Sequence, residues 1–159
     1  MARWVYNSPN GFRTRPYSTD PAVNPLKYSS LANLKEVHDI GEVWANMLHN
    51  VYAGLVAQSG WAADAFTNPE SSSGNVVFLR NFMDGLLIQP CNPTFVQARD
   101  AWVQADINRY QGAHRCIILK EFASRGLGVN AANFVDDFSV PEECAEAATS
   151  TIATTSTAV

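Results

Sequence analysis

The sequence lacks the short motifs that would assign an activity directly. It has no His-Glu-x-x-His segment, no Gly-x-Ser-x-Gly turn and no Cys-x-x-Cys pair, which are typical of zinc peptidases, serine hydrolases and zinc-binding modules respectively. It also has no run of lysine and arginine, and its net charge is −4, so we expect no nucleic-acid partner. No stretch of about 18 consecutive apolar residues occurs, so we expect no membrane span.

Charged residues are scarce as well. They make up 16% of the 159 residues, whereas 47% are hydrophobic. A chain of this length and composition is expected to fold as one domain with a real core and not to be disordered. The excess of apolar residues also leaves apolar surface for a partner. The first residues, Met1 to Trp4, do not follow the charged-then-apolar layout of a signal peptide, so we expect no targeting peptide in this chain.

The strongest helix pattern covers residues 33–58. Asn33 is expected to be the N-cap, with Glu36 completing a capping box. An apolar stripe this wide predicts burial on more than one side. It consists of a first set with helical spacing (Leu34, Val37, Gly41, Trp44, Leu48, Val51, Leu55) and a second set beside it (Val43, Met47, Tyr52, Val56).

Three further segments have helical spacing. They cover residues 75–89, 94–110 and 114–125, and Thr94 is the expected N-cap of the second. No alternation of apolar and polar residues predicts a strand. The fold class predicted from the sequence is therefore all-α, with about four main helices.

The flanks of this helical region have a different character. Residues 1–32 are rich in proline and aromatic residues, which predicts an irregular arm that packs on another surface. Residues 127–144 are also expected to be irregular, within a helical domain that covers 33–144. Residues 145–159 are nearly all alanine, threonine and serine, and we expect a disordered tail.

The three histidines do not form a metal site by spacing. His38, Glu42 and His49 share one helix face, but the separation of eleven positions between the two histidines corresponds to a rise of about 16 Å. One ion cannot bind both, and His38 with Glu42 could hold a metal only weakly. His114 lies far along the chain, and an ordinary structural role is the favoured interpretation for each histidine.

Other candidate groups have simpler explanations too. Cys91 could act as a nucleophile with His38 or His114 as base, but a structural bridge is favoured. The pair Asp136-Asp137 is best explained as a solvated surface. Cys91 and Cys116 flank a predicted helix and would lie about 27 Å apart, so Cys144 is the available partner for either of them.

Five segments carry a resemblance to a known family. They are NPLKYSSL (24–31), VHDIGEVWANML (37–48), QPCNPTFVQARDAWVQAD (89–106), FASRGLGVNAA (122–132) and PEEC (141–144). Over residues 3–144 the chain resembles the C-terminal part of the fungalysins, secreted fungal zinc metallopeptidases of the thermolysin-like superfamily.

The resemblance implies particular roles. In this family an HExxH helix and a downstream glutamate bind zinc, and both precede the part matched here, so zinc belongs to the intact enzyme and no cofactor is expected in this chain. His38, in a Val-His segment, is expected to donate a hydrogen bond to the oxyanion of the reaction. Arg15, in an Arg-x-x-Ser segment, is expected to hold a carbonyl of the peptide substrate. An extracellular location with one disulfide bond follows from the family.

Two hypotheses therefore remain. In the first, the chain is the helical lobe of a secreted metallopeptidase, inactive alone and joined to a zinc-binding lobe. In the second, it is a free-standing secreted helical module that binds a partner or self-associates as a dimer through its apolar face.

Overall fold

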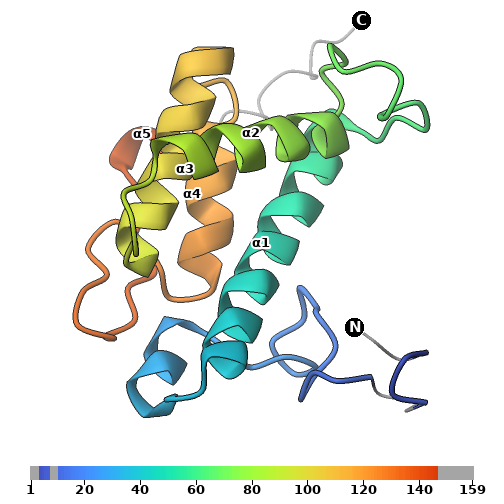
Figure 1. Cartoon of the computed structure of the whole chain (residues 1–159). Helices are drawn as coiled ribbons and strands as arrows, with labels where there is room; N and C mark the ends of the chain where they lie inside the picture. Colours follow the sequence, from blue (N-terminus) through green and yellow to red (C-terminus); the bar gives the residue numbers. More distant parts are fainter. Residues whose placement is uncertain (1–3, 8–10, 147–159) are drawn as a thin grey trace, which may run out of the picture.

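The computed structural model describes residues 4–7 and 11–146, and this part of the chain is mainly helical (Figure 1). The elements are η1 (Tyr28–Asn33), α1 (Val37–Ser59), α2 (Gly74–Ile88), α3 (Phe95–Tyr110), α4 (Arg115–Ser124) and α5 (Glu142–Glu146). The all-α prediction is confirmed, since the described residues form isolated β-bridges but no sheet. None of the described helices combines the length and the apolar character needed to cross a membrane.

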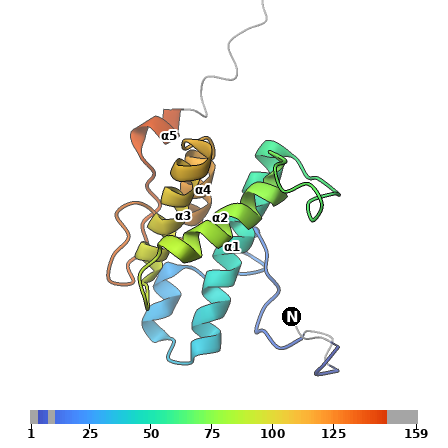
Figure 2. The same cartoon turned by 45° about the horizontal axis from the view of Figure 1, so that its top comes forward.

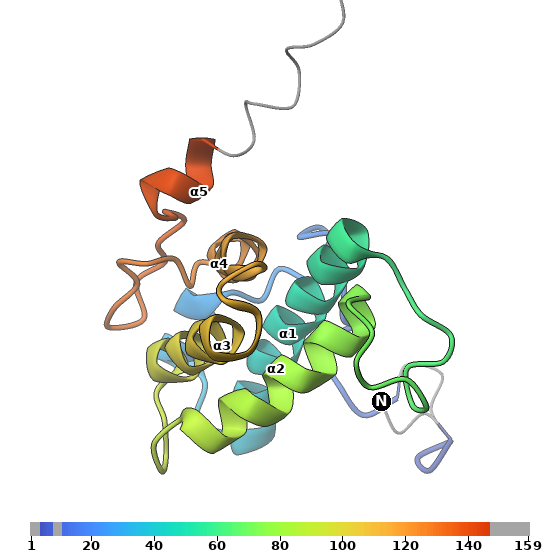
Figure 3. The ribbon, with the colours of Figure 1, turned by 90° about the horizontal axis from the view of Figure 1, so that it is seen from above.

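The four long helices pack around one core. Helix α1 contacts both α2 and α4, and α3 also contacts both of them. Seen from above, α1 to α4 surround a common centre and α5 lies outside this group (Figure 3). The short η1 lies beside the first turns of α1 (Figure 2).

Helix α1 supplies the centre of the core, as its wide apolar stripe predicted. The completely buried row has a spacing of four residues and consists of Val43, Met47, Val51 and Leu55. Phe122 of α4 stacks on Trp44, with ring centroids 5.5 Å apart, and is also completely buried. The prediction was wrong for Val37, which is exposed, because it lies in the first turn, beyond the reach of the neighbouring helices.

The start of α1 also differs from the prediction. Asn33 is the last residue of η1 and not the N-cap of α1, because residues 34–36 are extended and separate the two helices. Glu36 is the N-cap instead, and its Oε2 accepts hydrogen bonds from the backbone N–H groups of His38 (2.6 Å) and Asp39 (3.0 Å). A carboxylate at this position also complements the positive end of the helix dipole.

The predicted cap of α3 is confirmed. Thr94 accepts a hydrogen bond from the backbone N–H of Gln97, whose side chain accepts one from the N–H of Thr94. The flanks need two corrections. The arm predicted as irregular ends in η1, and α5 begins before the predicted start of the tail at 145, because Pro141 and two glutamates favour a helix N-terminus. The rest of the tail, residues 147–159, lies outside the described residues.

Candidate functional site at the start of α1

His38 is the second residue of α1, and its imidazole is exposed. The cap made by Glu36 satisfies the backbone N–H of His38 and so fixes this turn of the helix. The His38 side chain therefore projects from an ordered position at the positive end of a 23-residue helix. Such a position suits a group that donates a hydrogen bond to negative charge.

Two residues of the N-terminal arm contact this turn. Arg13 Nη1 donates a hydrogen bond to the backbone carbonyl of His38 over 2.8 Å. The ring of Phe12 meets the imidazole edge to face, with centroids 6.0 Å apart. The Arg13 guanidinium also lies 5.4 Å from the centroid of the Phe12 ring, so the arm places one cation and one aromatic ring beside His38.

Glu42 fastens the arm one helical turn further on. Its side chain is buried, and its Oε1 accepts hydrogen bonds from Thr14 Oγ1 (2.9 Å) and Arg15 N (2.9 Å). Its Oε2 accepts a third from Thr14 N (3.1 Å). The hypothesis that His38 and Glu42 form a weak metal pair is therefore replaced by another role for Glu42, because its carboxylate is occupied by the arm.

A second set of polar contacts holds the arm near the middle of α1. Asn46 Oδ1 accepts a hydrogen bond from Ser18 N (3.0 Å), and Arg125 Nη2 donates one to Ser18 O (2.6 Å). The same guanidinium donates to Asn50 Oδ1 (3.1 Å) and to Asn24 O (2.6 Å). Burial lowers the pKa of Arg125, against the attraction of Glu121 and Asp20. One buried arginine, directly after α4, thus joins the end of this helix to the arm and to α1.

Arg15 is placed differently from Arg13. Its backbone N–H is held by Glu42, whereas its side chain is exposed. Arg13 is the arginine whose guanidinium contacts His38. The contributions of Arg13, Phe12 and Glu42 to this site were not predicted from the sequence. The available signals were the aromatic character of the arm and the position of Glu42 four residues after His38.

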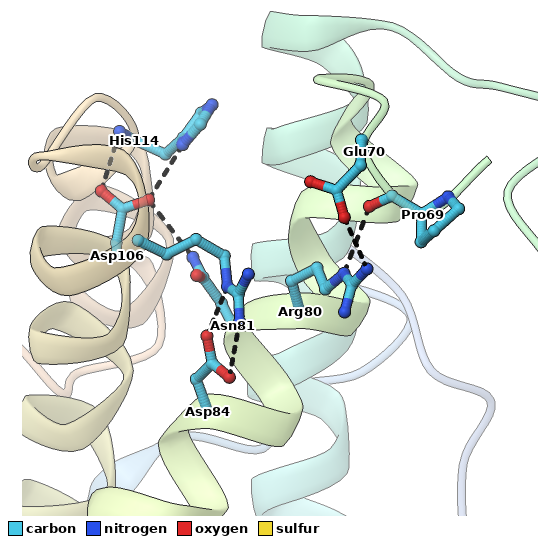
Figure 4. Close-up of polar contacts among 8 residues, drawn as sticks. Pro69, Glu70, Arg80, Asn81, Asp84, Asp106 and His114 are labelled. Carbon is cyan, nitrogen blue, oxygen red and sulfur yellow. Dashed lines mark hydrogen bonds and ion pairs between the residues drawn. The ribbon is translucent and has the colours of Figure 1, made fainter.

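The other two histidines lie apart from this site. His49 is partly buried near Tyr17, with ring centroids 6.5 Å apart. His114 forms a buried pair with Asp106, and Figure 4 shows both carboxylate oxygens engaged. Asp106 accepts hydrogen bonds from His114 N (2.9 Å) and Asn81 Nδ2 (3.3 Å), and its Oδ1 lies 2.9 Å from His114 Nδ1.

The residues present do not fit a zinc site. Within residues 4–7 and 11–146, no three histidine, cysteine, aspartate or glutamate side chains lie together as metal ligands. His114 is committed to Asp106 and Glu42 to the arm. A zinc ion needs three or four convergent ligands, so this part of the chain does not supply the set.

The cysteines form one bridge. Cys116 in α4 and Cys144 in α5 are disulfide-bonded, with their Cα atoms 5.1 Å apart. Cys91 is exposed and has no disulfide partner. The interpretation of Cys91 as a bridge residue is therefore wrong, because Cys144, which the sequence left available to either cysteine, pairs with Cys116 across the loop that follows α4.

The acidic pair Asp136-Asp137 anchors the loop after α4. Asp136 accepts hydrogen bonds from Ser29 N (2.7 Å) and Ser29 Oγ (2.8 Å) and lies 2.5 Å from Lys27 Nζ. Asp137 Oδ2 accepts hydrogen bonds from Ser139 Oγ (2.6 Å) and Asn130 N (2.9 Å). The interpretation of this pair as a merely solvated surface was wrong, because both carboxylates accept hydrogen bonds from other parts of the chain. Those of Asp136 come from Ser29, and those of Asp137 come from Asn130 and Ser139.

The Asp136 contacts predict a pH effect. Partial burial alone would raise the pKa of Asp136, but the hydrogen bonds from Lys27 and Ser29 outweigh it and lower the pKa below the ordinary value of an aspartate. A lowered folded-state pKa gives stability that is present above the unfolded-state pKa and disappears as pH falls through the folded-state pKa. We expect Asp136→Asn to lower the free energy of unfolding by about 1–2 kcal/mol near neutral pH.

This difference should close as the pH falls below about 4. Urea unfolding of both proteins across this range measures it. A gap between wild type and variant that is the same in acid as at neutral pH would contradict the role given to the ionised carboxylate.

Apolar hollows lie on the other side of the start of α1. One of about 370 Å³ is lined by η1, the starts of α1 and α3 and the loop after α4, and another of about 240 Å³ lies between α1, α2 and α3. Both include Ile40 and Phe95. Helix α2 also exposes Leu79, Met83, Leu86 and Leu87, so apolar surface is available for a partner.

Comparison with known proteins defines the class. The chain belongs to the Fungalysin metallopeptidase (M36) family, whose family model matches residues 1–131. This confirms the family resemblance carried by the sequence motifs.

Individual relatives are fungal metalloproteinases. The chain is 48% identical over 148 residues to the extracellular metalloproteinase 1 of Trichophyton tonsurans. This alignment covers 89% of this chain and 23% of the relative. The chain is 50% identical over 131 residues to that of Trichophyton equinum, covering 80% of this chain and 21% of the relative. The chain thus spans less than a quarter of the length of these relatives.

Proposed function

We propose that this chain is the helical lobe of a secreted fungal zinc metallopeptidase that hydrolyses peptide bonds. The lobe forms one wall of the substrate cleft, and the zinc-binding lobe forms the other. Support comes from the family, from the names of the extracellular relatives, and from the share of their length that the chain covers. The chain alone is inactive in this proposal.

His38 is the observation that carries the proposal. It is an exposed imidazole at the ordered, positive end of α1, and it lies next to the arm. An N–H of this ring donates a hydrogen bond to the oxyanion that forms when the peptide carbonyl is attacked. Donors that stabilise this charge act mainly in the transition state and therefore raise kcat.

The arm contributes to substrate binding in this proposal. The exposed Arg15 side chain is free to hold a backbone carbonyl of the peptide. Arg13, which contacts His38, supplies a second cation nearby. The zinc ion, which activates water and polarises the carbonyl when bound, is held by residues outside this chain.

The test compares the chain alone with a chimera. In the chimera, this chain replaces the matching segment of the Trichophyton tonsurans relative. We expect the chimera to cleave casein and to lose activity with a zinc chelator, whereas the pure chain cleaves none. Chelator-sensitive cleavage by the pure chain alone would overturn the proposal, as would a folded but inactive chimera beside an active parent enzyme.

A second candidate function rests on the exposed face of α2. Leu87 is 84% exposed and Met83 58% exposed, which is unusual for adjacent apolar side chains on one helix. A free-standing secreted module would use this face to bind a partner or to form a dimer. Light scattering that shows a dimer, together with an inactive chimera, would favour this function over the first.

A further inference from the structure

Glu42 is a buried carboxylate without a cationic partner among the described residues. Only 1% of its surface is exposed. Burying a charged group is costly unless hydrogen bonds replace its contacts with water. Here all three donors belong to the arm, at Thr14 and Arg15. The carboxylate therefore serves the attachment of the arm and does not pair with another helix.

The arm runs parallel to α1 in a defined register. Arg13 contacts His38, Thr14 and Arg15 contact Glu42, and Ser18 contacts Asn46. Glu42 is the helix residue that accepts hydrogen bonds from the two residues immediately after Arg13. A slip of one residue at Glu42 would place a different side chain beside the imidazole.

We propose that Glu42 is a positioning residue, whose carboxylate holds the arm so that Phe12 and Arg13 stand beside His38. This inference rests on the proposed function. Glu42 affects catalysis indirectly, because it arranges the surroundings of His38, the group that stabilises the oxyanion. Small displacements of such groups cost catalytic rate because the geometry must match the transition state.

The structure allows this role to be separated from folding. The contacts of Ser18 and Asn24 with Asn46, Asn50 and Arg125 hold the arm independently of Glu42. In Glu42→Gln the side chain keeps its shape, but an NH2 group replaces one of the two carboxylate oxygens and cannot accept the hydrogen bonds that this oxygen received from Thr14 or Arg15. The expected result is a loosened arm before Ser18 on a folded domain.

The first measurement is NMR on this chain. We expect Glu42→Gln to increase amide hydrogen exchange at Thr14 and Arg15 at least tenfold and to weaken the cross-peak between the rings of Phe12 and His38. Exchange at Val51, in the buried part of α1, should stay slow. The matched control is Glu121→Gln, which makes the same change at a partly buried position on α4.

The second measurement is peptidase kinetics in the chimera described above. We expect Glu42→Gln to lower kcat about tenfold with KM within about threefold, and Glu121→Gln to leave both unchanged. If Glu42→Gln does not fold, Thr14→Val tests the same contact from the exposed arm, by removing the Oγ1 donor. We expect a decrease in kcat of about threefold for Thr14→Val.

The outcomes are distinct. This inference would be contradicted if the arm stays in place in Glu42→Gln, or if the arm is loosened but kcat is unchanged. Neither result would contradict the proposed function. If changing His38 itself has no effect on kcat, the proposed function fails, while the NMR result still decides whether Glu42 holds the arm.

Discussion

Replacement of His38 by alanine is expected to lower kcat of the assembled peptidase by about 100- to 1,000-fold, the range observed when one oxyanion donor is removed. KM should change little, because the lost hydrogen bond forms mainly in the transition state. The exposed position of the ring means that folding should be unaffected. Steady-state kinetics on a peptide substrate, in the chimera with the Trichophyton relative, measures the effect.

His49→Ala is the matched control. It removes the same side chain from the same helix, eleven residues further on, at a position that contacts Tyr17 and not the start of α1. We expect kcat within about threefold of wild type. Equal losses in the two variants would show that the effect comes from α1 in general and would refute the role given to His38.

Replacement of Arg125 by methionine is expected to cause the largest loss of stability. The guanidinium is buried, and its removal leaves the acceptors on Asn50 and Asn24 without a donor, while Ser18 O keeps only the hydrogen bond from Asn50 Nδ2 (3.2 Å). Each unsatisfied buried group costs about 1–3 kcal/mol. We expect the free energy of unfolding to fall by about 3–5 kcal/mol, measured by urea unfolding of this chain.

Arg80→Met provides the comparison. Arg80 also donates to two oxygens, of Pro69 and Glu70 (Figure 4), but its ion pair with Glu70 lies at the surface. Surface pairs contribute little, so we expect a loss of less than about 1 kcal/mol. A similar loss in both variants would contradict the central role of Arg125.

The helices could be predicted from sequence because their signals are local. The spacing of Val43, Met47 and Val51 shows the core face of α1, and the pair Thr94 and Gln97 marks the start of α3. The start of α1 was misplaced because both Asn33 and Glu36 are suitable caps. Their choice depends on η1, whose position is set by the backbone bond from Tyr28 N to Arg125 O (2.9 Å).

The candidate site was predictable only in part. His38 was found through the family motif and not through spacing. The roles of Glu42 and Arg125 depend on contacts with the arm that span 27 and 107 residues of sequence. No local pattern predicts such pairs. The sequence around a glutamate in a helix looks the same whether its carboxylate faces water or a buried backbone N–H.

The bond between Cys116 and Cys144 has a consequence for a chain from a peptidase family. It encloses the loop that follows α4, over a sequence separation of 28 residues. Any clip of the backbone inside this enclosure leaves the two fragments tethered. On a denaturing gel, such a cleaved molecule would migrate as one species until a reductant is added. The loop can therefore be cleaved without loss of the C-terminal part of the domain.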